Sequence, residues 1–196
     1  MMFILFPFLG YLAGSLPFSI WITRYVKGVD VRDSGSGHAT TTNTIRQAGF
    51  GWGALVLILD ITKGFLPTYL AIKYSGTSWV IAATAVVAVV GHCWPVFAQF
   101  RGGMGLATFG GAILALNPFA FLICLGTLIL FVLIIRHSAR ATVFAGIAIA
   151  PLLWIFHIRD VAFGVGILGG LVIAVRFLID WNREYRELWL DREKVE

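Results

Sequence analysis

Long apolar stretches recur along almost the whole chain, and they constrain its fold more than any other feature. Each has about 17–25 residues, the length that an α-helix needs to cross the hydrocarbon core of a membrane. Of the 196 residues, 59% are hydrophobic and only 13% are charged, whereas a soluble domain carries about 25% charged residues. We therefore expect an all-α, polytopic integral membrane protein in which residues 1–196 form a single domain.

The spacing of these stretches predicts about seven transmembrane helices. The fourth is short, and Asn117-Pro118 separates it from the fifth, because proline disfavours helical conformation in the residue before it. No basic residue precedes the first stretch and no small-residue cleavage site follows it, so we interpret it as a retained span rather than a removed signal peptide. The expected helices cover about 3–23, 51–72, 78–97, 104–116, 117–135, 141–157 and 161–179.

Lysine and arginine are distributed unevenly between the two sides of these spans. With the N-terminus outside, twelve basic residues fall on inner segments and two, Lys73 and Arg159, on outer ones. Cytoplasmic loops carry the excess of basic residues in membrane proteins, so we expect the N-terminus outside and the C-terminus in the cytoplasm. The inner residues are Arg24, Lys27, Arg32, Arg46, Arg101, Arg136, Arg140, Arg176, Arg183, Arg186, Arg192 and Lys194.

A polar segment, residues 31–49, interrupts the apolar pattern on the expected cytoplasmic side. In Ser34-Gly35-Ser36-Gly37 the two glycines allow backbone N–H groups to turn inward, an arrangement that binds anions. Arg46 adds a planar cation suited to phosphate or carboxylate, and four threonines add hydroxyl donors: Thr40, Thr41, Thr42 and Thr44.

A second segment, residues 99–111, repeats this chemistry. Arg101 is followed by Gly102-Gly103 and Gly105 at the start of a short helix, where a helix N-terminus favours an anion. Two such loops on one face of the membrane predict a site for one or two phosphate groups. Ordinary turn chemistry is the alternative that spacing alone leaves open.

Charged side chains also occur inside or beside the spans. Asp60 and Lys63 are three residues apart and therefore on one helical face; they form either a structural ion pair or part of the site. His92 ends the third span as a structural residue or a base, and His38 lies within the first glycine loop. Cys93 and Cys124 indicate neither a disulfide framework nor a metal site.

In these motifs the sequence resembles the PlsY family, the bacterial membrane glycerol-3-phosphate acyltransferases that use acyl phosphate as donor. The matches occur in order from about residue 10 to the C-terminal tail. They are Gly14 to Phe18, Gly28 to Arg32, Ser34 to Gly37, Thr42-Asn43, Arg46 to Gly49, Asp60, Lys63-Gly64, Gly91-His92, Pro95, Phe100 to Gly103, Gly105 and Ala107-Thr108.

The resemblance implies a seven-helix fold with its active site at the cytoplasmic face of the bacterial cell membrane. Members transfer a fatty acyl group from acyl phosphate to glycerol 3-phosphate, giving 1-acyl-glycerol 3-phosphate, the first step of phospholipid synthesis. The expected partners are these two substrates and membrane lipid, without nucleic acid and without a cofactor. The net charge of +5 is dispersed between the spans, as topology requires.

The chemistry and the resemblance together select the candidate site residues. We expect Ser36 and neighbouring N–H groups to hold phosphate while Arg46 and Arg101 neutralise its charge. The general base is His38, His92 or a phosphate oxygen of the substrate. Catalytic candidates are Ser36, Arg46 and His92; phosphate-binding candidates are Gly35, Gly37, His38, Asn43, Arg101, Gly102, Gly103 and Thr142; possible lining residues are Asp60, Lys63, Met104, Asp180 and Asn182.

Several positions depart from the family pattern. Members usually have Asn at position 38, Gly-Ala at 40–41, Lys at 104, His at 177 and Asn at 180. This chain has His38, Thr40-Thr41, Met104, Phe177 and Asp180 instead, while Thr142 keeps an expected hydroxyl. Either another cation replaces the missing lysine, Arg101 being nearest in sequence, or the enzyme acylates a different acceptor. An anion-binding or transport protein is a third possibility, but its internal repeats are not evident.

Overall fold

A computed structural model describes residues 2–183, and all regular structure within them is helical. By length and composition, six segments can each cross a membrane. They are α1 with α2 (Met2–Gly14 and Phe18–Lys27), α4 (Phe50–Ser75), α5 (Ser78–Cys93) with the short turn Val96–Ala98, α7 (Pro118–Ile135), α8 (Ser138–Ile155) and α9 (Val161–Leu178). The expected all-α, polytopic membrane class is confirmed.

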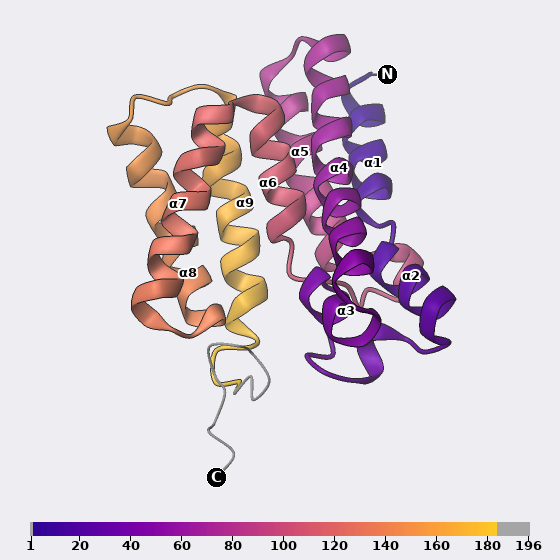
Figure 1. The fold of residues 1–196 in the computed structure, drawn as a ribbon. Helices are drawn as coiled ribbons and strands as arrows, with labels where there is room; N and C mark the ends of the chain where they lie inside the picture. Colours follow the sequence, from indigo (N-terminus) through magenta and orange to yellow (C-terminus); the bar gives the residue numbers. More distant parts are fainter. Residues whose placement is uncertain (1, 184–196) are drawn as a thin grey trace.

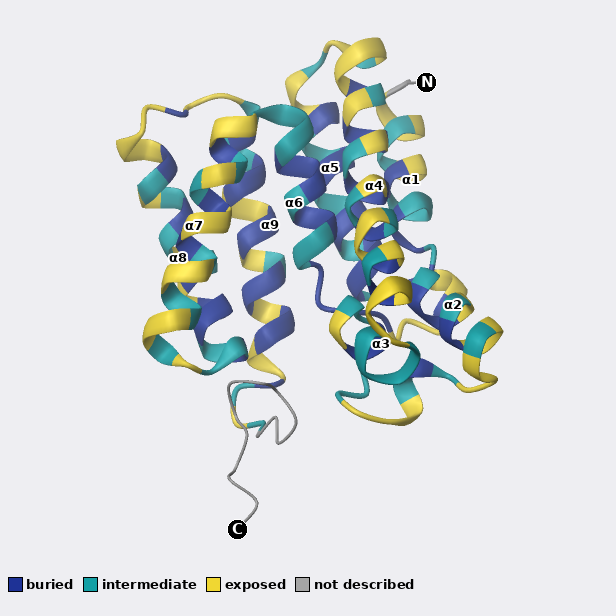
Figure 2. Ribbon diagram, viewed as in Figure 1, coloured by how far each residue is buried: buried dark blue, intermediate teal, exposed yellow. Residues whose placement is uncertain are grey.

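The helices form two groups joined through α6 (Leu106–Leu116), as Figure 1 shows. One group contains α1, α4 and α5, the other α7, α8 and α9, and α9 also contacts α5 and α6. Buried residues face between the helices, whereas the outer faces expose large apolar side chains such as Leu133, Ile134 and Leu171 (Figure 2). An apolar exterior of this kind is suited to lipid.

Glycines allow the closest helix contacts. A methyl group on Gly64 of α4 would overlap the carbonyl oxygen of Thr108 in α6, and one on Gly14 of α1 would overlap that of Ala88 in α5. Helices in membranes associate through such small residues, because lipid removes most of the hydrophobic drive for association. These contacts set the positions of α1, α4, α5 and α6, which carry most of the site described below.

The first expected span, 3–23, is not one continuous helix. The chain leaves the helix at Ser15–Pro17, because Pro17 has no N–H and disfavours helical conformation at Leu16. The Nζ of Lys63 in α4 donates a hydrogen bond of 3.0 Å to the carbonyl oxygen of Leu16. The break is therefore anchored to α4, and α2 follows as a separate helix whose last turn is basic.

The polar segment 31–49 contains a helix that its composition did not predict. Helix α3 (Thr41–Ala48) begins after Thr40, whose Oγ1 accepts a hydrogen bond from the Asn43 N–H at 3.3 Å. Threonine is a common N-cap for this reason. Helices α2 and α3 and the last turn of α9 all lie at one end of the molecule (Figure 1).

Helix α6 has only eleven residues, so it is about 16 Å long and cannot cross a hydrocarbon core about 30 Å thick. The irregular segment 99–105 precedes it and continues toward the end of the molecule that carries α2 and α3. We infer that α6 and this segment together make the fourth crossing.

A topology experiment tests the expected orientation. A reporter inserted at residues 75–77 should read external and one fused after Glu196 should read cytoplasmic. In Figure 1 the turn between α4 and α5 lies at the opposite end of the molecule from the last turn of α9, so the two reporters should read different sides. Glu196, Arg186, Arg192 and Lys194 lie outside the described residues. The reverse pair of signals would contradict the orientation, and equal signals would contradict the odd number of spans.

Candidate functional site

The two glycine loops that were expected to share a face are in direct contact. The Ala39 N–H donates to the carbonyl oxygen of Gly102 at 3.4 Å. Nη1 of Arg32 donates to the carbonyl oxygens of Ala98 and Arg101, at 2.9 and 3.2 Å. One side chain of the first loop therefore fixes the backbone of the second.

Arg32 is itself held by Asp30. Its Nε and Nη2 donate to the two carboxylate oxygens at 2.9 and 2.7 Å, and Arg24 donates to the same carboxylate at 2.6 Å. These hydrogen bonds from Arg32 hold the pKa of Asp30 well below its usual range, although partial burial acts in the opposite direction. From the sequence, Arg32 was a topology signal and part of a family motif, and the structure adds that it braces both loops.

Asn43 closes the first glycine loop from within. Its buried amide Nδ2 donates to the carbonyl oxygens of Val31, Ser34 and His38 at 2.7, 3.1 and 3.1 Å. Its Oδ1 accepts from the Ser36 N–H at 3.4 Å. With both amide hydrogens directed at these carbonyl groups, Asn43 shapes the loop, and the structure does not favour the expected direct contact with phosphate.

Within this loop, Gly35 and Gly37 have positive φ angles of 61° and 68°. A methyl group on Gly35 would overlap Asn43 Oδ1, so glycine is required there for both conformation and space. The hydroxyl of Ser36 is buried and has no hydrogen-bond partner within residues 2–183. An unpaired buried hydroxyl is unusual, and it is available to a bound ligand.

The second loop packs against His92. The Gly103 N–H donates to the His92 carbonyl oxygen at 3.1 Å, and a methyl group on Gly103 would overlap His92 Nε2 and the carbonyl oxygen of Ala39. A narrow pocket lies at this junction. It is lined by Gly14, Leu16, Pro17, Phe18, Ser19, Ala39, Lys63, His92, Pro95, Gly102 and Gly103.

A buried polar network lies beside this pocket. The Asp60 carboxylate is 2.9 Å from Lys63 Nζ and 3.7 Å from His92 Nδ1. Thr108 Oγ1 lies 3.1 Å from the same histidine nitrogen. Helices α4, α5 and α6 thus place Lys63 and His92 at the pocket with Asp60 and Thr108 as their partners. Thr108 was matched only as part of a motif, and its contact with His92 was not foreseen.

Arg46 and Arg101 carry cations at the same end of the molecule. Arg46 is partly exposed on α3 and Arg101 is exposed. Within residues 2–183 neither guanidinium group forms a hydrogen bond or an ion pair. Both are therefore available to an anion that approaches from the solvent.

The last turn of α9 adds a second polar cluster, around His38. His38 Nε2 is 2.7 Å from Asp180 Oδ2, and His38 Nδ1 is 3.4 Å from Arg176 Nη2. Burial lowers the pKa of His38 below its ordinary value; Arg176 and Arg183 lower it further, and Asp180 opposes them. His38 is therefore largely neutral at pH 7. Donation from Nε2 to Asp180 leaves Nδ1 to accept from Arg176.

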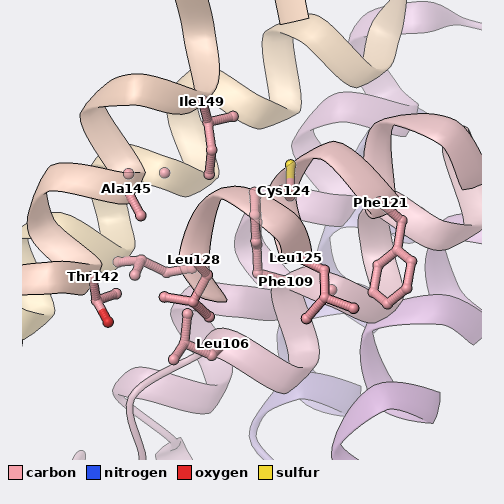
Figure 3. A pocket seen from close by; sticks show the side chains of 13 residues that line it. Leu106, Phe109, Phe121, Cys124, Leu125, Leu128, Thr142, Ala145 and Ile149 are labelled. Carbon is pink, nitrogen blue, oxygen red and sulfur yellow. The ribbon is translucent and has the colours of Figure 1, made fainter. Parts of the chain in front are cut away.

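Three predicted site residues, Met104, Asn182 and Thr142, do not line the narrow pocket at the junction of the loops. Met104 packs in an apolar cluster that also contains Phe177, and it lines neither pocket described here. Asn182 is exposed. Thr142 Oγ1 donates to the Ser138 carbonyl oxygen at 2.8 Å, and its side chain borders a separate apolar cavity of about 80 Å³ between α6, α7, α8 and α9 (Figure 3). The structure thus gives Thr142 an apolar setting, and its contact with phosphate stays a prediction.

No group of three or more His, Cys, Asp or Glu side chains within the described residues is placed to hold a metal ion. What the site offers is hydrogen-bond donors and positive charge. It combines the unpaired Ser36 hydroxyl, the ammonium group of Lys63 and the guanidinium groups of Arg46 and Arg101. That set suits a phosphorylated ligand.

Known proteins are similar to this chain in sequence and in fold. Residues 4–189 match the family model for glycerol-3-phosphate acyltransferase. A Thermotoga maritima protein named glycerol-3-phosphate acyltransferase 2 is 40% identical over 141 residues, 72% of each chain. A glycerol-3-phosphate acyltransferase of Fusobacterium nucleatum is 33% identical over 183 residues, 93% of this chain and 94% of the relative.

Two crystal structures of PlsY, described as an integral membrane glycerol 3-phosphate acyltransferase, have the same fold. The glycerol 3-phosphate form has a TM-score of 0.83 and 33% identity, covering 93% of this chain and 92% of the other. The lysophosphatidic acid form has a TM-score of 0.81 at the same identity. The match to the family model extends over nearly the whole chain, and the chain therefore belongs to the glycerol-3-phosphate acyltransferase family.

Proposed function

We propose that this protein transfers a fatty acyl group from acyl phosphate to the primary hydroxyl of glycerol 3-phosphate. The product is 1-acyl-glycerol 3-phosphate, and inorganic phosphate is released. The observation that carries the proposal is the junction of the two glycine loops at a pocket lined by Lys63 and His92, with Arg46 and Arg101 nearby at the same end. Both proposed substrates are phosphates, and PlsY structures are described in glycerol 3-phosphate and lysophosphatidic acid forms.

The reaction forms one bond and breaks another at the acyl carbon. The acceptor oxygen attacks the carbonyl carbon, and the bond from that carbon to the phosphate oxygen then breaks. Phosphate is already a good leaving group, so holding the two substrates in position and stabilising negative charge can provide most of the acceleration. In the proposal, Ser36 and the N–H groups of its loop hold phosphate, and Arg46 neutralises charge.

The proton of the acceptor hydroxyl goes to one of two groups. His92 Nδ1 faces Thr108 and Asp60, while its Nε2 faces Gly103 at the pocket. A phosphate oxygen of the donor is the other acceptor. His38 is a weaker candidate because its two ring nitrogens face Arg176 and Asp180.

The proposed location is the bacterial cytoplasmic membrane, with residues 1–196 acting as one domain and the site facing the cytoplasm. The excess of basic residues on the same side as the glycine loops supports this orientation. A water-soluble acceptor and a lipid-like donor can then meet at the membrane surface.

Purified protein in detergent, supplied with acyl phosphate and a panel of acceptors, tests the activity. We expect acylation of glycerol 3-phosphate and little of glycerol, which lacks the phosphate. Preference for another phosphorylated acceptor would replace the proposed substrate and keep the reaction class. No transfer to any acceptor would contradict the proposal.

We expect Arg46→Ala to weaken use of the phosphorylated substrates. Removing a hydrogen bond to a charged group costs about 1.5–3 kcal/mol, which corresponds to a rise in KM of about 10- to 150-fold. Steady-state kinetics with each substrate varied in turn would show which phosphate Arg46 contacts. Lys73→Ala, which removes an exposed cation at the far end of α4, is the control. Unchanged kinetics in a folded Arg46→Ala protein would leave Arg46 as a topology signal only.

A further inference from the structure

Two cationic side chains are buried within residues 2–183, and they are compensated differently. Lys63 is 6% exposed and its Nζ lies 2.9 Å from the Asp60 carboxylate. Arg176, on the last turn of α9, is 8% exposed, and within the described residues no carboxylate lies in salt-bridge distance of it. Arginine stays charged in proteins, so Arg176 is a buried positive charge without a direct counter-ion.

The surroundings of Arg176 are polar but uncharged. Its Nε donates to the Gly103 carbonyl oxygen at 3.0 Å, and Nη2 donates to that of Gly102 at 3.4 Å. Its guanidinium carbon lies 5.9 Å from the centre of the Trp94 ring, and the fourth neighbour is His38 Nδ1. These groups compensate part of the lost hydration. On its other side the His38 ring contacts Asp180, whose Oδ2 is 2.7 Å from His38 Nε2.

Burying an ion without its partner is costly, because the lost hydration is not replaced by an opposite charge. A fold keeps such a charge most readily where another molecule supplies the opposite charge during function. The carbonyl groups that Arg176 contacts belong to Gly102 and Gly103, which line the pocket beside Lys63 and His92. The uncompensated charge therefore lies directly behind the turn at which the proposed function needs an anion.

We propose that Arg176 supplies the buried positive charge that binds a substrate phosphate at the Gly102–Gly103 turn, with that phosphate as its missing counter-ion. The inference rests on the proposed function and assigns a residue to it. It also explains how Met104 can lie in an apolar cluster where family members have a lysine. Arg176 on α9 provides a positive charge at the same turn. Arg101, although nearer in sequence, is exposed and contributes its backbone carbonyl to Arg32.

A purely structural role for Arg176 predicts a different behaviour. A brace for the Gly102–Gly103 turn would stabilise the protein equally with and without an anion. A phosphate-binding charge instead couples stability to the anion, because ligands that bind only the folded state raise its stability. Measuring unfolding with and without phosphate therefore separates the two roles.

The experiment compares Arg176→Gln, Arg176→Lys and wild type, purified in detergent. The melting temperature is measured in inorganic phosphate and in sodium chloride of equal ionic strength, and KM is measured for glycerol 3-phosphate. Arg140→Gln is the matched control, because Arg140 lies at the same end and its Nε also donates to a backbone carbonyl, that of Trp181, at 3.1 Å.

We expect phosphate to raise the melting temperature of wild type, Arg140→Gln and Arg176→Lys, and to leave that of Arg176→Gln unchanged. KM for glycerol 3-phosphate should rise about tenfold or more in Arg176→Gln, the scale of a lost charged hydrogen bond. If Arg176→Gln does not fold, Arg176→Lys decides. Lysine offers a point charge in place of a planar guanidinium group, so at a phosphate-binding position we expect a smaller phosphate-dependent shift and a higher KM than in wild type.

Several results would overturn the inference. They are a phosphate-dependent shift that persists in Arg176→Gln with unchanged KM, no shift in wild type, or, where only Arg176→Lys folds, a shift and a KM equal to those of wild type. The melting experiment needs no acyl transfer, so it separates failure of this inference from failure of the proposed function. A wild-type protein that responds to phosphate through Arg176 but acylates nothing would contradict only the proposed function.

Discussion

Gly103→Ala should abolish most activity while the helices remain assembled. The added methyl group would overlap His92 Nε2 and the carbonyl oxygen of Ala39. The turn has little freedom to move away, because the Gly103 N–H is bonded to His92 and its carbonyl oxygen to Arg176. Displacing groups that position substrates is costly, and we expect kcat/KM to fall by about 100-fold or more, about 2.7 kcal/mol in the transition state.

Gly51→Ala is the matched control for this change. A methyl group on Gly51 meets nothing within 4 Å, and Gly51 lies in the first turn of α4, where alanine favours helix. Steady-state kinetics should therefore match wild type. Circular dichroism and the elution volume in detergent show whether both variants fold. A folded Gly103→Ala with wild-type kcat/KM would show that the contact between the two loops is unimportant for the reaction.

Lys63→Met should cause the largest loss of stability among the changes considered. It leaves the Asp60 carboxylate buried without its cation, and breaking a buried pair in this way costs about 3–5 kcal/mol. It also removes the hydrogen bond to Leu16 that anchors the break between α1 and α2. Thermal unfolding in detergent is the measurement, and a Lys63→Met protein as stable as wild type would contradict a buried ion pair.

The double variant Asp60→Asn with Lys63→Met distinguishes the two roles that the sequence left open for this pair. Neutralising both partners removes the uncompensated charge, so much of the stability should return. If the folded double variant keeps its activity, the pair is a structural fastener of α4. If it is stable but inactive, Lys63 acts in the pocket that it lines.

The transmembrane helices were predictable because hydropathy is a local property of sequence. Helix α7 begins at Pro118, next to the expected start, with the side chain of Asn117 as its cap. The break at Pro17 was missed, because proline alone does not mark it: Pro7, Pro67 and Pro151 all lie within helices. What distinguishes Pro17 is a distant partner, the Lys63 ammonium that bonds to the freed Leu16 carbonyl.

The site was predictable in outline and less so in the roles of its residues. The two glycine loops were expected to share a face, and the structure joins them. Asn43 and Thr142 were selected through the family resemblance, and in the structure each bonds to carbonyl groups of its own region. Arg176 was counted only as one more cytoplasmic charge. Its side chain reaches the Gly102–Gly103 turn because α9 packs against α5 and α6. No local sequence pattern reveals that packing.

The short helix α6 has a consequence for how the substrates arrive. On the inferred topology, in which the eleven residues of α6 and segment 99–105 make one crossing, Gly102–Gly105 lies below the membrane surface, at a depth where irregular backbone is tolerated only when protein or a water-filled cavity surrounds it. An acyl phosphate could then reach the site by lateral diffusion with its chain still among lipid tails, while the acceptor descends from the cytoplasm. In that arrangement turnover depends on the donor's surface density in the bilayer, its mole fraction among lipids, rather than on its bulk concentration.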